Sequence, residues 1–325
     1  MAWDRFDSQH PVQGDRRRFL ISGASSALLA GCAIGGAPTG GPAAGTYATA
    51  MREALRSATG ELPNYQFRSS PVGNFGVGSI YIDEIAGNDL RKAESSWFLG
   101  GPDNWLARLL PPAERQRWRQ RLVIEGSMGA INIDSSGSRD LHLQAGIALV
   151  SALTVNVGLD ATRGIDTRLQ ASEVLQRRLN WAEFQAALNA GQIAPEVADV
   201  VRRGRFVIVA ADVVLTGYRA DIAVDESRSP AIAVGLRTNL LSPSRIGGNA
   251  GFRVAESARG HFVVLAPQPV VAAVLFKRPP PVSKDLYGGL PVDLDAWPTA
   301  GVSEKAVAAV EAELLRKSGS RSFEK

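Results

Sequence analysis

The chain has 325 residues, and its 36 lysines and arginines against 32 aspartates and glutamates leave a net charge of +4. The two signs are interspersed, which argues against a nucleic-acid-binding surface, so no nucleic-acid partner is expected. The single cysteine, Cys32, excludes intrachain disulfides and zinc sites built on several thiolates. We expect neither a cofactor nor a metal site.

The first informative stretch is RRRFLISGASSALLAGC, residues 16–32. Three arginines precede a run whose apolar part is shorter than the roughly 20 residues that a spanning helix needs. Serines and glycines within the run also lower its hydrophobicity and its helix propensity. A basic start, a short apolar segment and a small-residue end are the layout of a cleaved export signal.

The start of this stretch, RRRFL, resembles the twin-arginine signature, in which two arginines are followed by any residue, then Phe and Leu. Two flanking positions depart from the usual pattern, with Asp15 in place of Ser or Thr and Ile21 in place of Lys. The resemblance implies export by the twin-arginine (Tat) translocase. The signal-recognition residues that it implies are Arg16, Arg17, Phe19 and Leu20.

The end of the stretch, LAGC, resembles the bacterial lipobox in all four positions. The resemblance implies that the lipoprotein signal peptidase cuts before Cys32, whose thiol then carries a diacylglyceryl group. The cleavage residues that it implies are Leu29, Ala30 and Gly31. The protein is then expected on a cell membrane, anchored by this lipid and facing the periplasm or the cell exterior. The alternative is that Cys32 is an ordinary buried thiol.

Composition divides the chain into four parts. Residues 1–31 form the signal peptide, and residues 32–46 hold the lipidated cysteine and a Gly/Pro/Ala tether that behaves as a flexible coil. Residues 47–278 form an α+β envelope domain. Residues 279–325 form a Pro-rich connector and a C-terminal amphipathic helix, with Ser303 as its cap and Val307, Val310 and Leu314 on its apolar face.

The first part of the domain mixes short helices with strands. A helix is predicted over 47–58, with Met51, Leu55 and Ala58 on one face, and a Gly-rich turn leads into a strand at 79–83. Residues 103–120 predict one helix broken by two prolines. Residues 121–134 alternate as a strand, and a polar turn predicts that this strand pairs with residues 141–160 in a hairpin.

Residues 168–203 have a helical period. Ser172 is predicted to cap a first helix whose stripe is Val174, Leu175 and Leu179. Asn180 is predicted to cap a second helix, which Gly191 closes and which buries Trp181, Phe184 and Leu188. Pro195 suits the first turn of a third, which buries Val197, Val200 and Val201.

Strand signals return after this segment. Residues 205–225, 230–238, 251–257 and 261–278 are rich in β-branched side chains and are bounded by Gly, Pro, Ser or Asn. Because strands and helices are clustered rather than alternating, the order favours an α+β fold with a mainly antiparallel sheet, a helical segment at about 168–203 and peripheral helices.

Two patterns resemble ligand loops but depart from them. The glycine loop at 73–78 leads into a strand instead of opening a helix, so a tight turn is favoured over a phosphate cradle. Residues 132–137 match the start of an EF-hand loop, but Gln144 stands where the bidentate Glu is required. A hairpin turn is favoured there over a calcium site.

No arrangement identifies a catalytic residue. His142 and His261 begin strand patterns without a nucleophile motif, which is typical of structural histidines. Among the acidic residues, Asp83 and Glu84 point to opposite faces of a strand. Asp221 and Asp225, on a regular strand, are about 13 Å apart, which is too far for paired catalysis. Asp212 lies inside an apolar strand and needs either a partner such as an arginine or an outward-facing position.

The sequence therefore favours a non-enzymatic binding or structural role in the cell envelope, with an unidentified ligand or protein partner. One alternative is an envelope hydrolase that uses carboxylates or a histidine. Another is a membrane-inserting, pore-forming β-rich protein. Residues 141–158 and 261–276 are long enough for membrane strands, but they are so uniformly apolar that a buried sheet is favoured.

Replacing Cys32 by alanine removes the only thiol that the lipid could modify. We expect the variant to lose incorporation of labelled fatty acid and to move from the membrane fraction to the soluble envelope fraction. Unchanged membrane association would contradict the lipid anchor.

Overall fold

A computed structural model of the chain describes residues 59–86 apart from 74, 97–106, 110–133, 165–227, 229–240, 251–280 and 293–303, with scattered residues of 48–56 and 306–314. All of them belong to one compact unit, Pro42–Lys325. The predicted signal peptide, Cys32 and the tether lie outside the described residues.

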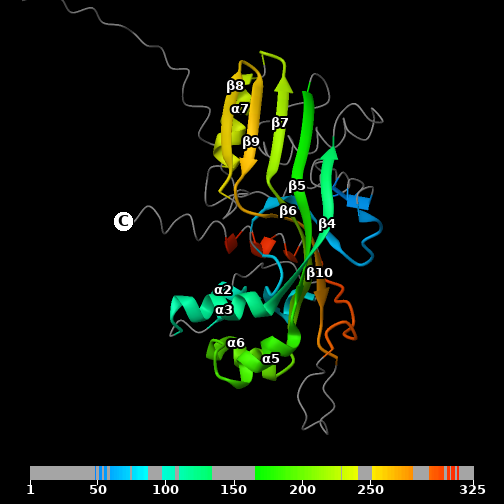
Figure 1. Cartoon of the computed structure of the whole chain (residues 1–325), viewed down its shortest axis with the longest axis vertical. Helices are drawn as coiled ribbons and strands as arrows, with labels where there is room; N and C mark the ends of the chain where they lie inside the picture. Colours follow the sequence, from blue (N-terminus) through cyan, green and yellow to red (C-terminus); the bar gives the residue numbers. More distant parts are fainter. Residues whose placement is uncertain are drawn as a thin grey trace, which may run out of the picture. The chain divides into compact units, whose positions relative to one another are not determined.

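The described strands form a ten-stranded antiparallel sheet in the order β1-β10-β6-β5-β7-β9-β8, with β4 paired to β5 and β2 paired to β3 and β6 (Figure 1). This arrangement confirms the predicted α+β class. The strands are β1 (Gln66–Val72), β2 (Ile80–Ile82), β3 (Phe98–Gly100), β4 (Val123–Ile133), β5 (Ile165–Leu179), β6 (Phe206–Thr216), β7 (Tyr218–Val224), β8 (Arg253–Ala258), β9 (His261–Ala266) and β10 (Val270–Lys277).

The sheet divides into two halves along β5. One edge of β5 pairs with β7 and then with β6, and the other edge pairs with β4. Gly217 separates β6 from β7 and has φ +59°. On either side of this residue the pairing differs: β6 pairs with β10, and β7 pairs with β9. We call β7, β8, β9 and residues 165–171 of β5 the amphipathic half, and β1, β6, β10 and residues 172–179 of β5 the buried half.

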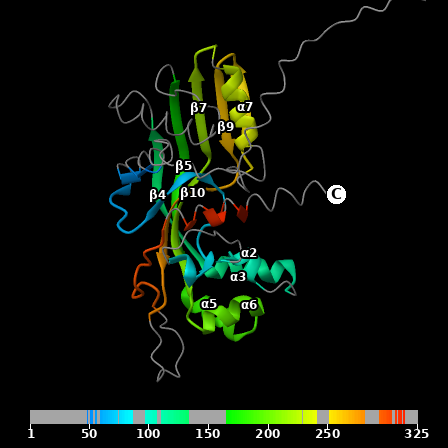
Figure 2. The ribbon, with the colours of Figure 1, turned by 180° about the vertical axis from the view of Figure 1, so that it is seen from behind.

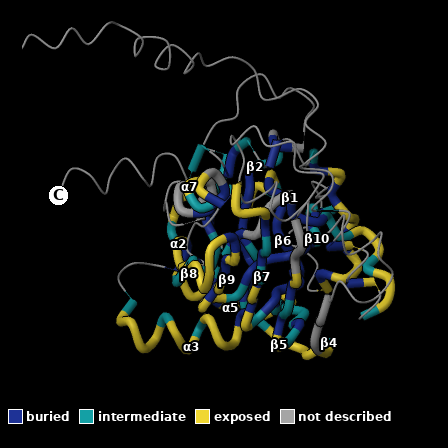
Figure 3. The backbone as a smooth tube through the Cα atoms, turned by 90° about the horizontal axis from the view of Figure 1, so that it is seen from above, coloured by how far each residue is buried: buried dark blue, intermediate teal, exposed yellow. Residues whose placement is uncertain are grey.

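The buried half is covered on both faces, and β6 shows this directly because every residue before Thr216 is buried. Successive side chains of a strand point to opposite faces. Phe206 and Ile208 pack into a cluster with Trp181 and the helices, whereas Val207 and Val209 pack into a second cluster with the C-terminal segment. Dark blue strands accordingly fill the centre of Figure 3.

Four short helices build the first of these clusters: α2 (Pro102–Trp105), α3 (Pro112–Leu122), α5 (Trp181–Asn189) and α6 (Pro195–Arg202). Asn180 caps α5, because its side-chain oxygen accepts a hydrogen bond from the Glu183 N–H at 3.3 Å. Gly191 takes φ +68° after α5, and Pro195 begins α6. The two predicted helices here and the break before α3 are confirmed.

The C-terminal segment returns to the sheet and covers the second cluster. The Ala300 N–H donates to the Phe276 carbonyl at 3.0 Å, and Lys277 Nζ donates to the Trp297 carbonyl at 2.6 Å. The described residues from 306 to 314 are helical, and Val307 and Val310 are buried as predicted. This segment is therefore part of the folded core.

The amphipathic half is covered on one face. Its apolar side chains pack against Ile232 and Leu236 of α7 (Ser229–Leu240) and against Met51 and Leu55. Figure 2 shows α7 lying across β9. The described residues of the predicted 47–58 helix are helical, with Met51 and Leu55 inside.

The prediction of a helix over 168–179 was wrong, because these residues lie in β5. Arg, Glu, Gln and Leu favour a helix locally, but β5 forms backbone hydrogen bonds along both edges. The predicted stripe is divided among three clusters: Val174 packs in the cluster that includes Ile232 and Leu236, Leu179 packs with the helices, and Leu175 packs with the C-terminal segment. Ser172 caps no helix and donates its hydroxyl to the Thr216 carbonyl at 3.0 Å.

The prediction of a strand over 230–238 was also wrong, because α7 occupies these residues. Pro230 fits the first turn of a helix, and Ile232 and Leu236 are four residues apart, so a helix places both on the sheet. The other strand signals predicted after residue 204 are confirmed, although 205–225 divides into β6 and β7 and 261–278 divides into β9 and β10. The strand predicted at 121–134 is β4, which begins at Val123 after the end of α3. The predicted hairpin partner at 141–160 lies outside the described residues.

Gly217 is required where the sheet divides, because a Cβ there would meet the Ser172 hydroxyl and φ is positive. We expect Gly217→Ala to lower the free energy of unfolding by about 1–3 kcal/mol. Ser172→Ala should restore part of that loss in the Gly217→Ala background, although alone it removes a hydrogen bond. Strictly additive effects in denaturant titrations would contradict this contact.

Candidate functional site

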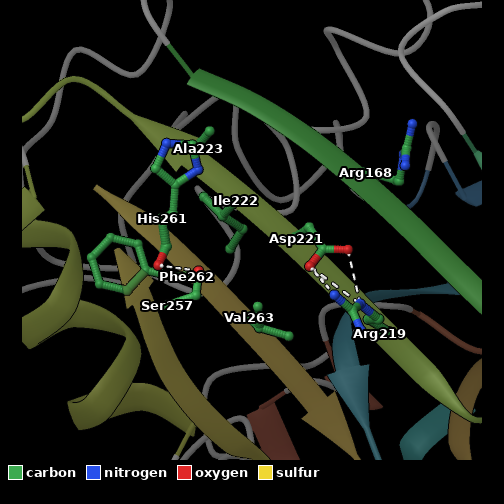
Figure 4. Close-up of a pocket in the computed structure, with 9 residues that line it drawn as sticks. All are labelled: Arg168, Arg219, Asp221, Ile222, Ala223, Ser257, His261, Phe262 and Val263. Carbon is green, nitrogen blue, oxygen red and sulfur yellow. Dashed lines mark hydrogen bonds and ion pairs between the residues drawn. The ribbon is translucent and has the colours of Figure 1, made fainter. Parts of the chain in front are cut away.

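Polar side chains of the described residues gather in hollows on both halves of the sheet, and two of these hollows are relevant here. The first, of about 400 Å³, lies on the polar face of the amphipathic half. Figure 4 shows side chains from four neighbouring strands along it. Arg219 binds Asp221 through both carboxylate oxygens, with Nε to Oδ2 at 2.9 Å and Nη2 to Oδ1 at 2.8 Å. The hydrogen bonds to Asp221, and then its charge, raise the pKa of Arg219.

Ser257, His261 and Asp221 all line this hollow, which tests the hydrolase alternative. The Ser257 hydroxyl donates to the backbone carbonyl of His261 at 3.4 Å, while Asp221 is held by Arg219. Nucleophilic catalysis needs the hydroxyl to bond the imidazole and the imidazole to bond the carboxylate. Here the Ser257 hydroxyl bonds a backbone carbonyl and the Asp221 carboxylate bonds Arg219, so these residues do not form a catalytic triad.

The other sequence candidates do not converge on a site. Asp83 forms an ion pair with Arg278 at 3.0 Å, and Glu84 follows it in the short helix η1 (Asp83–Ala86). Asp225 is exposed just after β7. His142 and most of the EF-hand-like stretch lie outside the described residues.

The second hollow is a cleft of about 740 Å³ beside the buried half, which we call the Arg177 cleft. Asp212, in the middle of β6, is fully buried behind it. Arg177 of β5 binds Asp212 with Nε to Oδ1 at 2.9 Å and Nη2 to Oδ2 at 2.6 Å. Burial lowers the pKa of Arg177, but the hydrogen bonds and charge of Asp212 outweigh it, so the pKa is raised. The guanidinium therefore stays charged.

The glycine loop that the sequence singled out forms one wall of this cleft. The Val77 N–H donates to Asp212 Oδ2 at 2.7 Å. A Cβ on Gly76 would meet Asp212 Oδ2 and would lie 2.8 Å from Arg177 Nη2. Gly78 has φ +80°. The loop is a tight turn, as predicted, and its glycines let the backbone close over the ion pair.

Asp212 therefore has the arginine partner that one of the two predicted explanations required, and the outward-facing alternative is wrong. Arg177 could not be identified because β5 was predicted as a helix. A signal was nevertheless present, because an acidic residue in an apolar strand demands a buried cation.

A second buried ionic cluster joins the C-terminal segment to β1 and β2. Arg68 Nη1 donates to Glu311 Oε1 at 2.6 Å, and the Tyr81 hydroxyl donates to the same oxygen at 3.1 Å. Burial raises the pKa of Glu311 and is opposed by the charge of Arg68, and burial also raises the pKa of Tyr81. Sequence analysis missed this cluster, because residues more than 200 positions apart give no local pattern.

Among the described residues, no group of histidine, cysteine, aspartate or glutamate is placed to hold a metal ion. No helix in that part of the chain is long and apolar enough to cross a membrane.

Comparisons with known proteins identify no family. No protein-family model and no curated protein matches the chain. Among solved structures, the chain is similar to a bacterial gasdermin from Bradyrhizobium tropiciagri, with 14% sequence identity, coverage of 79% of this chain and 94% of that chain, and a TM-score of 0.34. A TM-score this low assigns neither fold nor function to this protein.

The Arg177–Asp212 pair predicts a strong asymmetry between single and double variants. Arg177→Met leaves a carboxylate buried without its partner and should lower the free energy of unfolding by about 3–5 kcal/mol. Arg177→Met with Asp212→Leu removes both charges and should unfold within about 1–2 kcal/mol of wild type. Denaturant titration measures both values. A double variant less stable than Arg177→Met would contradict the pairing.

Proposed function

We propose that this is a non-enzymatic, lipid-anchored protein of the cell envelope that inserts part of its β-sheet into a membrane. The lipobox and twin-arginine resemblances support attachment at Cys32 after export. An antiparallel sheet of long-range pairings folds slowly, which suits a route that carries folded proteins. An anchored domain would stay beside a bilayer, in which apolar side chains exposed by a conformational change could be buried.

The amphipathic half has the alternation that a membrane β-sheet requires, with apolar side chains on one face and polar side chains on the other. Along β7 and β9, residues alternate between buried and more exposed positions. Ile222 and Phe262 belong to the apolar face, and Arg219, Asp221 and His261 line the polar face. The same alternation stabilises ordinary half-buried sheets, so it permits insertion without requiring it.

Two long connections leave this half of the sheet at the same end. Ile165 at the start of β5 pairs with Val224 at the end of β7. Residues 134–164, which join β4 to β5, and residues 225–252, which join β7 to β8, therefore both begin or end there. β4 and β5 are antiparallel neighbours, which a hairpin of about 2–5 residues could join. The connection at 134–164 is therefore far longer than this pairing requires.

The observation that carries the proposal is the sequence of α7, which lies in the second connection. Its residues PAIAVGL alternate large and small side chains in a strand pattern, yet they are helical. The helix buries Ile232 and Leu236 but leaves the Val234 residue 63% exposed. In a strand, Ile232, Val234 and Leu236 would share one face. Helix α7 is therefore a segment whose alternating side chains would also suit a membrane strand.

A change of α7 from helix to strand would uncover the part of the apolar face that Ile232 and Leu236 now cover. Burying one large aliphatic side chain contributes about 1.5–3 kcal/mol, so exposing this face to water is strongly unfavourable. A bilayer offers the same side chains an apolar environment. Insertion would thus depend on a nearby membrane, which the proposed anchor provides.

Val234→Lys tests the role of α7. Val234 is exposed in the helix, so the variant should unfold within about 0.5 kcal/mol of wild type. In a membrane strand, a lysine facing lipid costs about 2–4 kcal/mol at the midplane. We therefore expect wild-type protein to release calcein from phosphatidylglycerol–phosphatidylethanolamine vesicles and Val234→Lys to release it at least tenfold more slowly.

Ile124→Lys is the matched control, because Ile124 is 55% exposed at the opposite end of β4 from the connection at 134–164. It should release dye like wild type. The absence of dye release by the wild-type protein, or equal release by Val234→Lys, would contradict the proposed insertion and would leave a binding or structural role.

A further inference from the structure

The Arg177 cleft has features that membrane insertion does not use. The residues that line it include Phe75, Phe98 and Leu314 together with polar residues such as Asn104 and Gln268. One arginine is fixed in the wall by a buried carboxylate. Ligand sites are commonly concave, largely apolar and oriented by a few polar groups, and their volumes are about 300–1,000 Å³.

The guanidinium of Arg177 is bound along only one of its edges. Asp212 takes the edge formed by Nε and Nη2. Nη1 and the second hydrogen of Nη2 form the other edge, and no described residue accepts a hydrogen bond from Nη1. Arg177 lines the cleft with a side chain that is 22% exposed, whereas Asp212 is fully buried.

A carboxylate or phosphate matches this open edge, because two of its oxygens can accept the parallel N–H bonds of a guanidinium fork. The buried Asp212 and the Val77 N–H hold the ion pair rigid before any ligand arrives. The cation is thus prepared without the loss of side-chain entropy that a free arginine would incur on binding.

The remaining charges of the cleft are paired with one another. Arg119 Nε lies 2.7 Å from Asp103 Oδ1, and Arg119 Nη2 donates to Asp103 Oδ2 at 3.0 Å. Outside the lining, the exposed Glu125 lies opposite Arg177 on β4, and its charge also acts on the guanidinium. Recognition would therefore come from the directed fork of Arg177 and from apolar contact rather than from net positive charge. A bare inorganic anion would use only the first of these two contributions.

We propose that the Arg177 cleft binds a small amphiphile with a carboxylate or phosphate head, the head on the open edge of Arg177 and the apolar body against Phe75, Phe98 and Leu314. The proposal is independent of insertion through α7, which lies on the other half of the sheet.

The test uses the full chain carrying Cys32→Ala, purified without detergent, and titration calorimetry with octanoate and octyl phosphate below their micelle concentrations. We expect saturable binding of both probes. Octanol and inorganic phosphate each lack one half of the recognised chemistry and should bind at least tenfold more weakly. Equal affinity for octanol would overturn the role of Arg177, and equal affinity for inorganic phosphate would overturn the apolar part.

Three variants complete the test. Arg177→Met with Asp212→Leu removes the fork and should weaken binding of octanoate at least tenfold. Gln268→Trp fills the rim of the cleft from an exposed position and leaves the ion pair intact, so it should weaken binding similarly even if the double variant folds poorly. Arg178→Met changes the neighbouring exposed arginine and should bind like wild type. Unchanged binding in both cleft variants would overturn the proposal.

Discussion

The ion pair of Arg177 and Asp212 is the interaction on which the buried half of the sheet depends. It links β5, β6 and the loop between β1 and β2, since Asp212 also accepts the Val77 N–H. A buried carboxylate without such partners would be strongly destabilising. The loop must therefore pass close enough to donate its N–H, and Gly76 permits that approach because it has no Cβ. Asp212 thus requires a cation on β5 and a close approach of the loop between β1 and β2.

The covering of the two halves follows from how the helices and the termini are distributed. Around the ion pair, both faces of β6 are occupied, by the helices on one side and by the C-terminal segment on the other. Beyond Gly217, β7 and β9 have only one covered face, and the other carries Arg219 and Asp221. The half with two cores is suited to holding a rigid cleft. The half with one core can expose its apolar face by losing a single layer.

Local signals predicted the elements whose ends carry specific chemistry. Asn180 and Pro195 identified the starts of α5 and α6, because a cap and a first-turn proline act within one turn. The glycine loop was recognised as a turn for the same reason. The partners of Asp212 and Glu311 could not be predicted, since each lies on an element brought close only by the complete sheet. The sequence shows that a buried carboxylate such as Asp212 needs a cationic partner, but which residue provides it depends on the topology of the sheet.

The two wrong assignments, β5 and α7, have opposite causes. Residues 168–179 favour a helix but are held as a strand by neighbours on both edges. Residues 230–238 favour a strand but are held as a helix by Ile232 and Leu236 packing on the sheet. Conflicts between local preference and fold lower stability, and proteins tend to keep them where function needs them. Backbone hydrogen bonds along both edges hold β5 as a strand against its local preference for a helix. Helix α7 is held only by one packed face and leaves Val234 exposed. If either segment changes conformation, α7 is the one that can do so without dismantling the ion pair at the centre of the sheet.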